Sequence, residues 1–232
     1  FEDSTTVIRV ADSRAGWARA LRELIAMLYV GQVPVLDVED VRPSGAKLKT
    51  MGGRASGPAP LVDLYRFAIQ LFKKAKGRKL YPIECHDLMC KIGEVVVVGG
   101  VRRSALISLS NLSDDQMRHA KSGDWWKTET QRALSNNSIA YENKPEMETY
   151  MREWLALYES KSGERGMFNR EASDKQVAKN GRRETGHKWG TNPCSEIILR
   201  PYQFCNLSEV VVRNDDTLET LNKKVRVATI LG

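Results

Sequence analysis

The sequence predicts an α/β fold with mainly parallel strands, and three observations lead to this prediction. Short apolar runs typical of strands alternate with longer segments in which apolar residues recur every three or four positions, as on one face of a helix. The first two predicted strands, residues 6–10 and 33–38, flank one such helix, which is typical of a right-handed βαβ unit. Glycine-rich or basic loops also follow predicted strands, where ligands gather in parallel α/β sheets.

The composition suits a globular protein with an anionic ligand. The chain has 232 residues, 41% of them hydrophobic and 28% charged, which is enough to form a core. Its net charge of +7 suits a nucleotide or a nucleic acid. Four cysteines without a signal peptide favour a reducing cytoplasm over a disulfide framework. No apolar run approaches the length of a membrane span.

In the N-terminal half, three amphipathic helices are predicted. The first covers residues 16–30 after Asp12 or Ser13 as its N-cap, and the second covers residues 61–76 with lysines in its last turn. The third is predicted from Pro82 to Glu94. These helices supply the apolar stripes that a sheet in an α/β fold packs against.

The C-terminal half continues the alternation. The predicted elements are, in order, a strand at 106–109, a helix with Ser113 as N-cap, a turn at 124–126, a polar loop at 135–138 leading into a strand at 139–141, an amphipathic helix at 145–160, a loop or short helix at 173–188, a strand at 210–212 and a helix from Thr217 onward. The chain begins at Phe1 inside a predicted strand and ends at Gly232 after an apolar run. We therefore expect a segment of a longer protein.

The loop at 42–61 combines glycines with basic residues. Glycines let backbone amides approach a ligand, and basic side chains neutralise phosphate. The candidate ligand-binding residues are Arg42, Lys47, Lys49, Gly52 and Gly53. Because the loop matches neither the Walker A nor the GxGxxG pattern, its spacing is a weak phosphate signal, and a flexible surface loop is the alternative.

A second candidate loop follows the apolar run Val95–Val98, which is typical of a buried parallel strand. Its residues, at 99–105, combine a Gly-Gly turn with two arginines that can bind phosphate or a base. The candidate residues are Gly99, Gly100, Arg102, Arg103 and Ser104. An ordinary exposed turn is the alternative.

A metal site must be considered where Cys85, His86, Asp87 and Cys90 share a predicted helix. His86 and Cys90 are four residues apart and share a helical face, but Cys85 and Cys90, five apart, do not. Since the sequence offers no second ligand pair nearby, we expect core packing and no bound metal.

The strongest chemical signal is the stretch 190–209. Pro193 excludes Asn192 from the helical region, so we expect extended chain or a turn. In extended chain, Asn192, Cys194 and Glu196 would point the same way. An amide, a thiol and a carboxylate would then surround one polar substrate. Cys205, eleven positions after Cys194, suggests thiol redox chemistry, while a buried cysteine without chemistry is the alternative.

Three motifs together resemble ribonucleotide reductases: NPCSEIILRPYQFCNL, RPSGAKLKTMGGRASGP and GGVRRSA. The chain is most similar to the adenosylcobalamin-dependent class II enzymes of the monomeric, triphosphate-reducing type. Members of that family usually have glycine where this chain has Ser195. The resemblance implies a ten-stranded α/β barrel, of which residues 1–232 would form a single partial domain.

The resemblance also implies residue roles. Cys194 would become a thiyl radical, Glu196 would act as general base, and Asn192 would help to hold the ribose hydroxyls. Cys205 would be one of two reducing cysteines, with its partner upstream of this chain. The loop at 42–61 would lie near a deoxynucleoside triphosphate effector, and the loop at 99–105 would link that effector to the substrate base.

The expected partners follow from the same resemblance. They are a ribonucleotide substrate, adenosylcobalamin as cofactor, a thioredoxin-type or dithiol reductant, and the remaining parts of the enzyme. We expect the segment alone to be catalytically silent.

Two other functions are open from the residues. A nucleic-acid-binding module would suit the net charge of +7, but the basic residues are interspersed with acidic ones and only 7% of residues are aromatic. A hydrolase using Cys194 with His187 would need an oxyanion hole that the sequence does not reveal.

Overall fold

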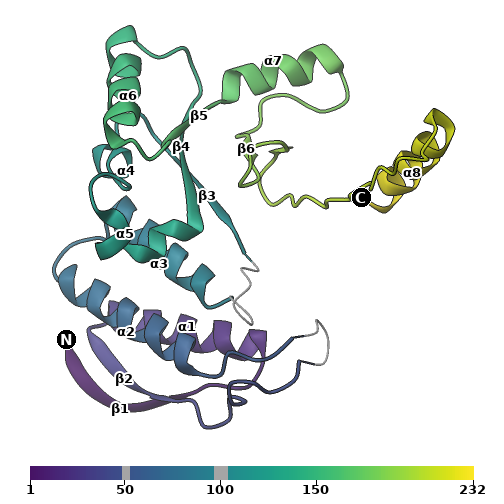
Figure 1. Ribbon diagram of the computed structural model, residues 1–232. Coiled ribbons are helices and arrows are strands. Elements are labelled where there is room, and N and C mark those ends of the chain that lie inside the picture. Colours follow the sequence, from purple (N-terminus) through teal and green to yellow (C-terminus); the bar gives the residue numbers. More distant parts are fainter. Residues whose placement is uncertain (49–52, 97–103) are drawn as a thin grey trace. The chain divides into compact units, whose positions relative to one another are not determined.

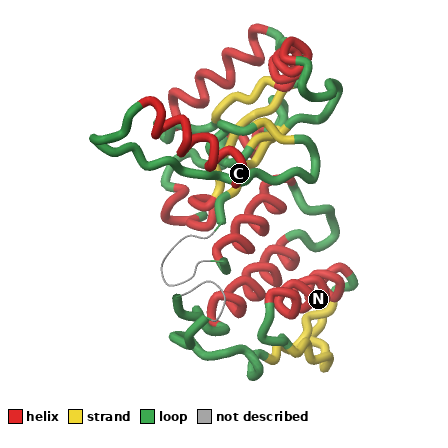
Figure 2. Tube along the Cα trace, turned by 90° about the vertical axis from the view of Figure 1, so that its right-hand side faces the viewer, coloured by secondary structure: helices red, strands yellow, loops and turns green. Residues whose placement is uncertain are grey.

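The computed structural model describes residues 1–48, 53–96 and 104–232, which form two compact units, residues 1–171 and 172–232 (Figure 1). The larger unit holds two parallel sheets, and in Figure 2 these are separate groups of yellow strands with red helices between them. The predicted α/β class with parallel strands is therefore confirmed.

The N-terminal βαβ unit forms as predicted. Strand β1 (Glu2–Arg9) pairs in parallel with β2 (Gln32–Asp37), and helix α1 (Arg14–Tyr29) connects them. Ser13 is the N-cap of α1, and its side chain accepts a hydrogen bond from the backbone N–H of Gly16. A parallel pair requires such a crossover connection, because a tight turn can join only antiparallel neighbours.

Helix α2 (Ala59–Lys74) completes the core of this region. It packs on α1 with the apolar stripe that the sequence predicted, and Lys73 and Lys74 lie in its last turn. The most buried members of the shared core are Ile8, Val10, Leu24, Leu28, Leu61, Leu64, Tyr65 and Ala68. Burial of apolar area at roughly 25 cal/mol per Å² is the main force that holds these elements together.

The second sheet has three parallel strands in the order β3 (Leu106–Ser110), β4 (Ser135–Tyr141) and β5 (Gly166–Asn169). Short helices α4 (Asp115–Arg118) and α5 (Trp125–Thr128) and the 3₁₀ helix η1 (Thr130–Leu134) connect β3 to β4. Helix α6 (Met147–Ser160) connects β4 to β5. All three strands therefore end at one edge of the sheet.

The prediction of a strand at Val95–Val98 is wrong for the two residues that the structure describes. Helix α3 (Pro82–Glu94) is followed by a turn, in which the N–H groups of Val95 and Val96 donate to the carbonyls of Ile92 and Gly93. These bonds continue the last helical turn and leave no donor for a sheet. Val97 and Val98 lie outside the described residues.

The predicted polar loop at 135–138 is instead the first half of β4, the middle strand. Buried polar groups of this half-strand form hydrogen bonds with residues of other segments. Lys121 Nζ donates to the Ser135 carbonyl at 2.5 Å, and the N–H of Asn137 donates to Glu164 at 3.0 Å. A polar sequence can occupy a central strand when most of its buried groups are paired in this way. The buried side-chain nitrogen of Asn137 is an exception, since it has no hydrogen-bond partner among the described residues.

Other expectations at element ends differ in detail. Asp114, not Ser113, is the N-cap of α4, since its carboxylate accepts from the N–H of Met117. The expected turn at 124–126 runs into α5, and α7 (Arg170–Asn180) is the helical part of the stretch at 173–188. No strand forms at 210–212, whereas α8 (Leu218–Leu231) begins after Thr217 as predicted.

Helix α6 buries a carboxylate while its apolar side faces outward. Glu153 is 3% exposed and accepts hydrogen bonds from Arg165 at 2.7 Å and from Arg118 at 2.7 Å. The apolar residues that share the predicted face are exposed: Met147, Met151, Trp154, Leu155 and Tyr158. The orientation of α6 is therefore set by buried ion pairs and not by the apolar stripe.

A second buried ion pair joins α3 to η1. Asp87 accepts two hydrogen bonds of 2.7 Å from Arg132, and His86 lies 3.4 Å from Asp87 and 3.3 Å from the side-chain oxygen of Asn137 on β4. Burial alone would raise the pKa of Asp87, but the hydrogen bonds from Arg132 and His86 lower it below its ordinary value. The network thus connects α3, η1 and β4.

The smaller unit is built around a short hairpin. Strands β6 (Gly190–Thr191) and β7 (Ile198–Leu199) pair antiparallel, and Trp189, directly before β6, is fully buried. The hairpin turn carries Ser195 at φ +67°, in the left-handed region that favours glycine. This conformation fits the glycine that the resemblance leads us to expect at this position.

We predict that Arg132→Met lowers the free energy of unfolding by about 3 kcal/mol, because it leaves the Asp87 carboxylate buried without its main partner. Asp87 has a lowered pKa in the folded chain, so its stabilising contribution is present above the pKa of unfolded Asp and is lost as the pH falls below about 4. Urea unfolding monitored by circular dichroism between pH 3 and pH 7 measures both effects.

The matched control is Arg66→Met, which removes the exposed pair of Arg66 with Asp63 and should cost at most about 0.5 kcal/mol. Equal losses in the two variants, or an Arg132→Met loss that persists unchanged at pH 3, would contradict the assignment of the buried pair.

We also predict that Ser195→Gly stabilises the smaller unit by about 1 kcal/mol, because glycine does not pay the steric cost of the left-handed region. Thermal unfolding or amide exchange of the hairpin residues measures the change. Ser208→Gly is the control, since Ser208 has no positive φ and should gain nothing. If Ser195→Gly gains no more stability than Ser208→Gly, this explanation is wrong.

Candidate functional site

The stretch with the candidate thiol is a turn, which is one of the two conformations expected after Asn192, and not extended chain. The N–H of Ser195 donates to the carbonyl of Asn192 at 2.9 Å, and the N–H of Ile197 donates to the Asn192 side-chain oxygen at 3.0 Å. Pro193 favours this turn because its ring fixes φ near the value that the second turn residue needs. Extended chain does not form here, because the side-chain oxygen of Asn192 accepts a hydrogen bond from the backbone of the turn.

Asn192, Cys194 and Glu196 therefore do not converge as expected. Asn192 is 6% exposed and faces the hairpin, whereas Cys194 and Glu196 are exposed. The buried amide gives the turn its shape, and the turn presents the thiol at its tip. Such a thiol is accessible to a reacting group that approaches from outside the unit, which packing alone would not require.

Asp174 on α7 fixes the segment that enters the hairpin. Its carboxylate accepts a hydrogen bond of 2.6 Å from the Trp189 indole and one of 3.0 Å from the N–H of Gly186. The hydrogen bond from Trp189 is the main cause of its lowered pKa, and the one from Gly186 adds to it. Sequence analysis missed Asp174, because no motif connects it to residues twelve and fifteen positions later.

Cys205 lies in the irregular segment after β7 and is half-buried. It belongs to the same compact unit as Cys194, and both are free thiols. The turn before it is closed by Arg200, whose N–H donates to the Gln203 side chain at 2.8 Å. The second thiol is thus present in the unit that holds the first.

The loop at 42–61 is partly ordered by its own basic residues. Arg42 donates to Asp12 at 2.7 Å, and Lys47 forms an isolated antiparallel bridge with Arg54. Gly53 has φ +88°, and its carbonyl accepts from the N–H of Leu48 at 3.1 Å. Lys49 and Gly52 lie outside the described residues. Of the candidate cations here, Arg42 already has a carboxylate partner.

The candidate loop at 99–105 is described only from Ser104 onward; Gly99, Gly100, Arg102 and Arg103 lie outside the described residues. The Ser104 hydroxyl donates to the carbonyl of Gly93 at 3.1 Å. Gly93 itself is tightly packed, because an added Cβ would lie 1.9 Å from Leu134. This hydrogen bond brings the chain before the loop close to the chain after it.

Of the two cysteines of α3, only Cys90 packs as a small apolar residue. Cys90 is fully buried, 3.7 Å from His86 Nε2, and burial raises the pKa of its thiol to about 12. Cys85 is exposed, on another face of the helix. Within residues 1–48, 53–96 and 104–232, no cluster of three or more His, Cys, Asp or Glu is suited to a metal ion.

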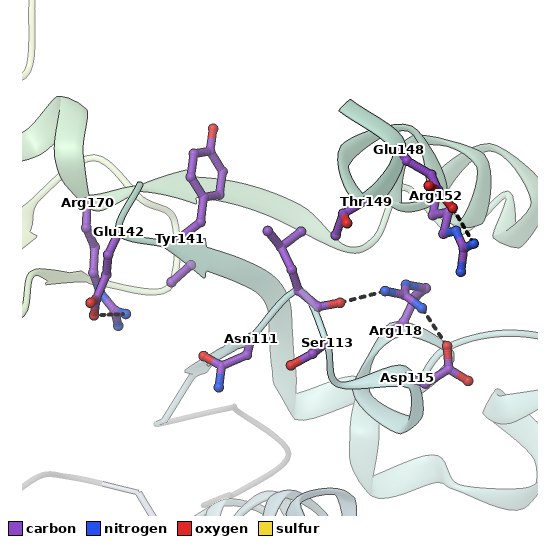
Figure 3. Close-up of a pocket in the computed structure, with 12 residues that line it drawn as sticks. Asn111, Ser113, Asp115, Arg118, Tyr141, Glu142, Glu148, Thr149, Arg152 and Arg170 are labelled. Carbon is purple, nitrogen blue, oxygen red and sulfur yellow. Dashed lines mark hydrogen bonds and ion pairs between the residues drawn. The ribbon is translucent and has the colours of Figure 1, made fainter. Parts of the chain in front are cut away.

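A cavity of about 710 Å³ lies where the strands of the second sheet end (Figure 3). Asn111, Glu142 and Arg170 line it and directly follow β3, β4 and β5. Figure 3 shows Arg152 beside Glu148 and Arg170 beside Glu142, and these pairs measure 2.5 and 3.4 Å. Sequence analysis missed this cavity, although residues after parallel strands are a recognised signal.

None of the helices in the described part of the chain has the length and apolar character to cross a membrane.

Known proteins are similar to this chain over most of its length. The family model of the B12-dependent ribonucleotide reductase insertion domain matches residues 2–71. The adenosylcobalamin-dependent ribonucleoside-triphosphate reductase of Lactobacillus gasseri is 35% identical over 215 residues, which are 87% of this chain and 28% of that protein. The enzyme of the same name from Lactobacillus leichmannii is 34% identical, with the same coverage.

A crystal structure of a B12-dependent, class II ribonucleotide reductase matches with a TM-score of 0.67 and 30% sequence identity. The match covers 84% of this chain and 27% of that one. The chain thus spans about a quarter of the length of the relatives it matches. Over that quarter, the chain is similar to class II, B12-dependent ribonucleotide reductases.

Proposed function

We propose that this chain forms part of the catalytic core of a class II ribonucleotide reductase, which reduces ribonucleotides, most readily triphosphates, to deoxyribonucleotides. The observation that carries the proposal is the exposed Cys194 thiol at the tip of a turn shaped by the buried Asn192 amide. The names of the relatives support the reaction and the triphosphate substrate.

The proposed architecture is the ten-stranded α/β barrel of these enzymes, of which residues 1–232 would be one part. The parallel order β3-β4-β5 supports it, because such a barrel needs adjacent parallel strands joined by crossovers.

Cys194 would start the reaction as a thiyl radical. It loses the hydrogen atom of its S–H bond and then takes the 3′ hydrogen of the ribose, so that its S–H bond is restored and the unpaired electron moves to the sugar. Glu196, exposed next to the same turn, would accept the proton of the 3′ hydroxyl. The 2′ hydroxyl would take a proton from one of the two reducing thiols and leave as water. The buried Asn192 amide would keep the thiol in position.

Two further electrons would come from two thiols. Cys205 and a second cysteine would be oxidised to a disulfide as the sugar is reduced, and a thioredoxin-type or dithiol reductant would restore them. The half-buried position of Cys205, in the same unit as Cys194, supports this role.

Adenosylcobalamin is the proposed cofactor, in line with the relatives' names. When bound, it supplies the radical that takes a hydrogen atom from a thiol. The exposed Cys194 fits that requirement, since its sulfur is not enclosed by its own unit, whereas the fully buried Cys90 does not.

The two candidate loops would bind a deoxynucleoside triphosphate effector and the substrate base. The proposed residues are Arg42, Lys47, Lys49, Gly52, Gly53, Gly99, Gly100, Arg102, Arg103 and Ser104. The Ser104–Gly93 hydrogen bond supports a fixed base for the second loop. We place the protein in the cytoplasm.

The alternatives have less support. A nucleic-acid-binding module is not favoured, because many basic side chains, such as Arg118 and Arg165, are buried in ion pairs. His187, the proposed base of a hydrolase, packs edge-on against Trp189 at 5.3 Å and lies 3.8 Å from Glu184. These contacts give it no role beside Cys194.

We predict that Cys194→Ser in a complete reductase containing this segment abolishes turnover and leaves nucleotide binding nearly unchanged, because a hydroxyl keeps the polarity of a thiol but does not readily carry the radical. Deoxynucleotide formation measured by chromatography tests this. Cys85→Ser, which alters an exposed cysteine of α3, should retain full activity. Turnover by Cys194→Ser at a tenth of the parent rate would rule out the radical role.

We predict that Arg102→Ala and Arg103→Ala change which substrate each effector favours more than they change the maximal rate. Charge-assisted hydrogen bonds to nucleotides contribute about 1.5–3 kcal/mol each. Turnover of four ribonucleotides with each deoxynucleotide effector gives the pattern. If both variants keep the parent pattern, the loop is only a structural turn.

A further inference from the structure

Positive charge gathers on the surface of the larger unit at residues 73–79, where α2 ends. We call this set the basic cluster; it consists of Lys73, Lys74, Lys76, Arg78 and Lys79, and all five residues are exposed. Glu84 is the only acidic residue between positions 73 and 84. Charges of one sign this close together repel each other, so the cluster favours the approach of an anionic group.

The chain itself neutralises one of these five charges. Arg78 donates to both carboxylate oxygens of Glu84 at 2.7 Å. Among the described residues, the ammonium groups of the four lysines have no hydrogen-bond or ion-pair partner. Two of them lie in the last turn of α2 and favour its macrodipole. Lys76 and Lys79 lie beyond that turn, where the macrodipole effect falls off.

The turn between α2 and α3 gives the basic cluster an ordered backbone. Gly77 has φ +82°, in the left-handed region that lets the chain leave the helix. The N–H of Arg78 then donates to the carbonyl of Ala75 at 3.1 Å, and the N–H of Tyr81 donates to Glu84 at 2.8 Å. Because this backbone is already fixed, a partner that binds here does not have to order it.

An exposed apolar stripe continues from the basic cluster along α3. Tyr81, Cys85 and Met89 follow each other at four-residue spacing and so lie on one face of the helix. Tyr81 is 47% and Met89 53% exposed, and Cys85 is exposed as well. The guanidinium of Arg78 lies 4.1 Å from the centre of the Tyr81 ring, which brings the cluster to the start of the stripe.

The chemistry of the stripe distinguishes between two kinds of anionic partner. Single-stranded nucleic acid binds where bases can stack on aromatic faces, but Cys85 and Met89 offer no such face, and Arg78 covers one side of the Tyr81 ring. Methionine and tyrosine are instead enriched where proteins contact each other, because they pack against apolar side chains. The surface therefore fits a protein partner with carboxylates next to apolar groups.

We propose that the stripe of Tyr81, Cys85 and Met89 docks an acidic amphipathic helix of another protein, with the carboxylates of that helix facing the basic cluster. The apolar side chains of such a helix recur every three or four residues, which matches the four-residue spacing of the stripe. Its carboxylates meet the four lysines that have no partner within this chain. Such charge complementarity speeds the encounter and fixes the orientation of the bound helix.

The test uses a complete reductase that contains this segment. The probe is a fluorescein-labelled peptide of glutamate and leucine, with leucine at every third or fourth position, and fluorescence anisotropy measures its binding. Lys76→Gln/Lys79→Gln should weaken binding about fivefold at low salt, since each exposed charge pair contributes about twofold. Met89→Gln should weaken it to a similar extent through lost apolar contact. Added salt should reduce the effect of the lysine variant and not that of Met89→Gln.

Cys85 reports occupancy of the stripe directly. Its alkylation by iodoacetamide, followed by mass spectrometry, should be slowed by the peptide at concentrations that saturate the anisotropy signal. The matched control is Lys144→Gln/Lys179→Gln, which removes two exposed lysines of other segments and should bind the peptide as the parent does.

Four results would overturn the inference. The control may lose as much affinity as the lysine variant, or the peptide may leave Cys85 alkylation unchanged. Cys85 may fail to react without the peptide, which would show that the enzyme itself or a second copy covers the stripe. Finally, oligothymidylate may bind more tightly than the peptide and protect Cys85, which would identify a nucleic-acid surface.

Discussion

The ion pair between Asp87 and Arg132 is the contact on which the larger unit depends. It joins α3 to η1 through two hydrogen bonds of 2.7 Å, and His86 extends it to Asn137 on β4. Apolar burial holds the N-terminal βαβ unit to α2, but this polar network fixes α3 next to the second sheet. Removing one partner of such a pair costs more than the pair contributes, because the other charge stays buried.

Local pattern was sufficient to predict most helices and the first sheet. The βαβ unit, α1, α2 and α3 follow from apolar spacing and capping residues, whose effects act within one helical turn. The start of β4 could not be predicted, because residues 135–138 are polar and their burial depends on Lys121 and Glu164, at distant positions in the sequence. The orientation of α6 could not be predicted for the same reason, since it depends on Arg118 and Arg165.

The candidate site shows the same division. Sequence alone predicts Cys194, Glu196 and Cys205 as the residues with chemistry, but the relation of Asn192 to them depends on a hydrogen bond that closes a turn. Asp174 has no motif, since its role comes from the tertiary contacts of α7 with the segment before the hairpin. Chemistry-bearing residue types are local information, whereas their directions are not.

Two asparagines near the hairpin, Asn192 and Asn180, should differ in their rates of deamidation. Spontaneous deamidation begins when the backbone nitrogen of the next residue attacks the asparagine side chain. Asn192 precedes Pro193, whose nitrogen carries no hydrogen, so the amide that shapes the turn is chemically protected. Asn180 precedes Gly181, the least hindered neighbour, at φ +61°. Old protein would therefore keep its turn intact while acquiring a new negative charge at the end of α7.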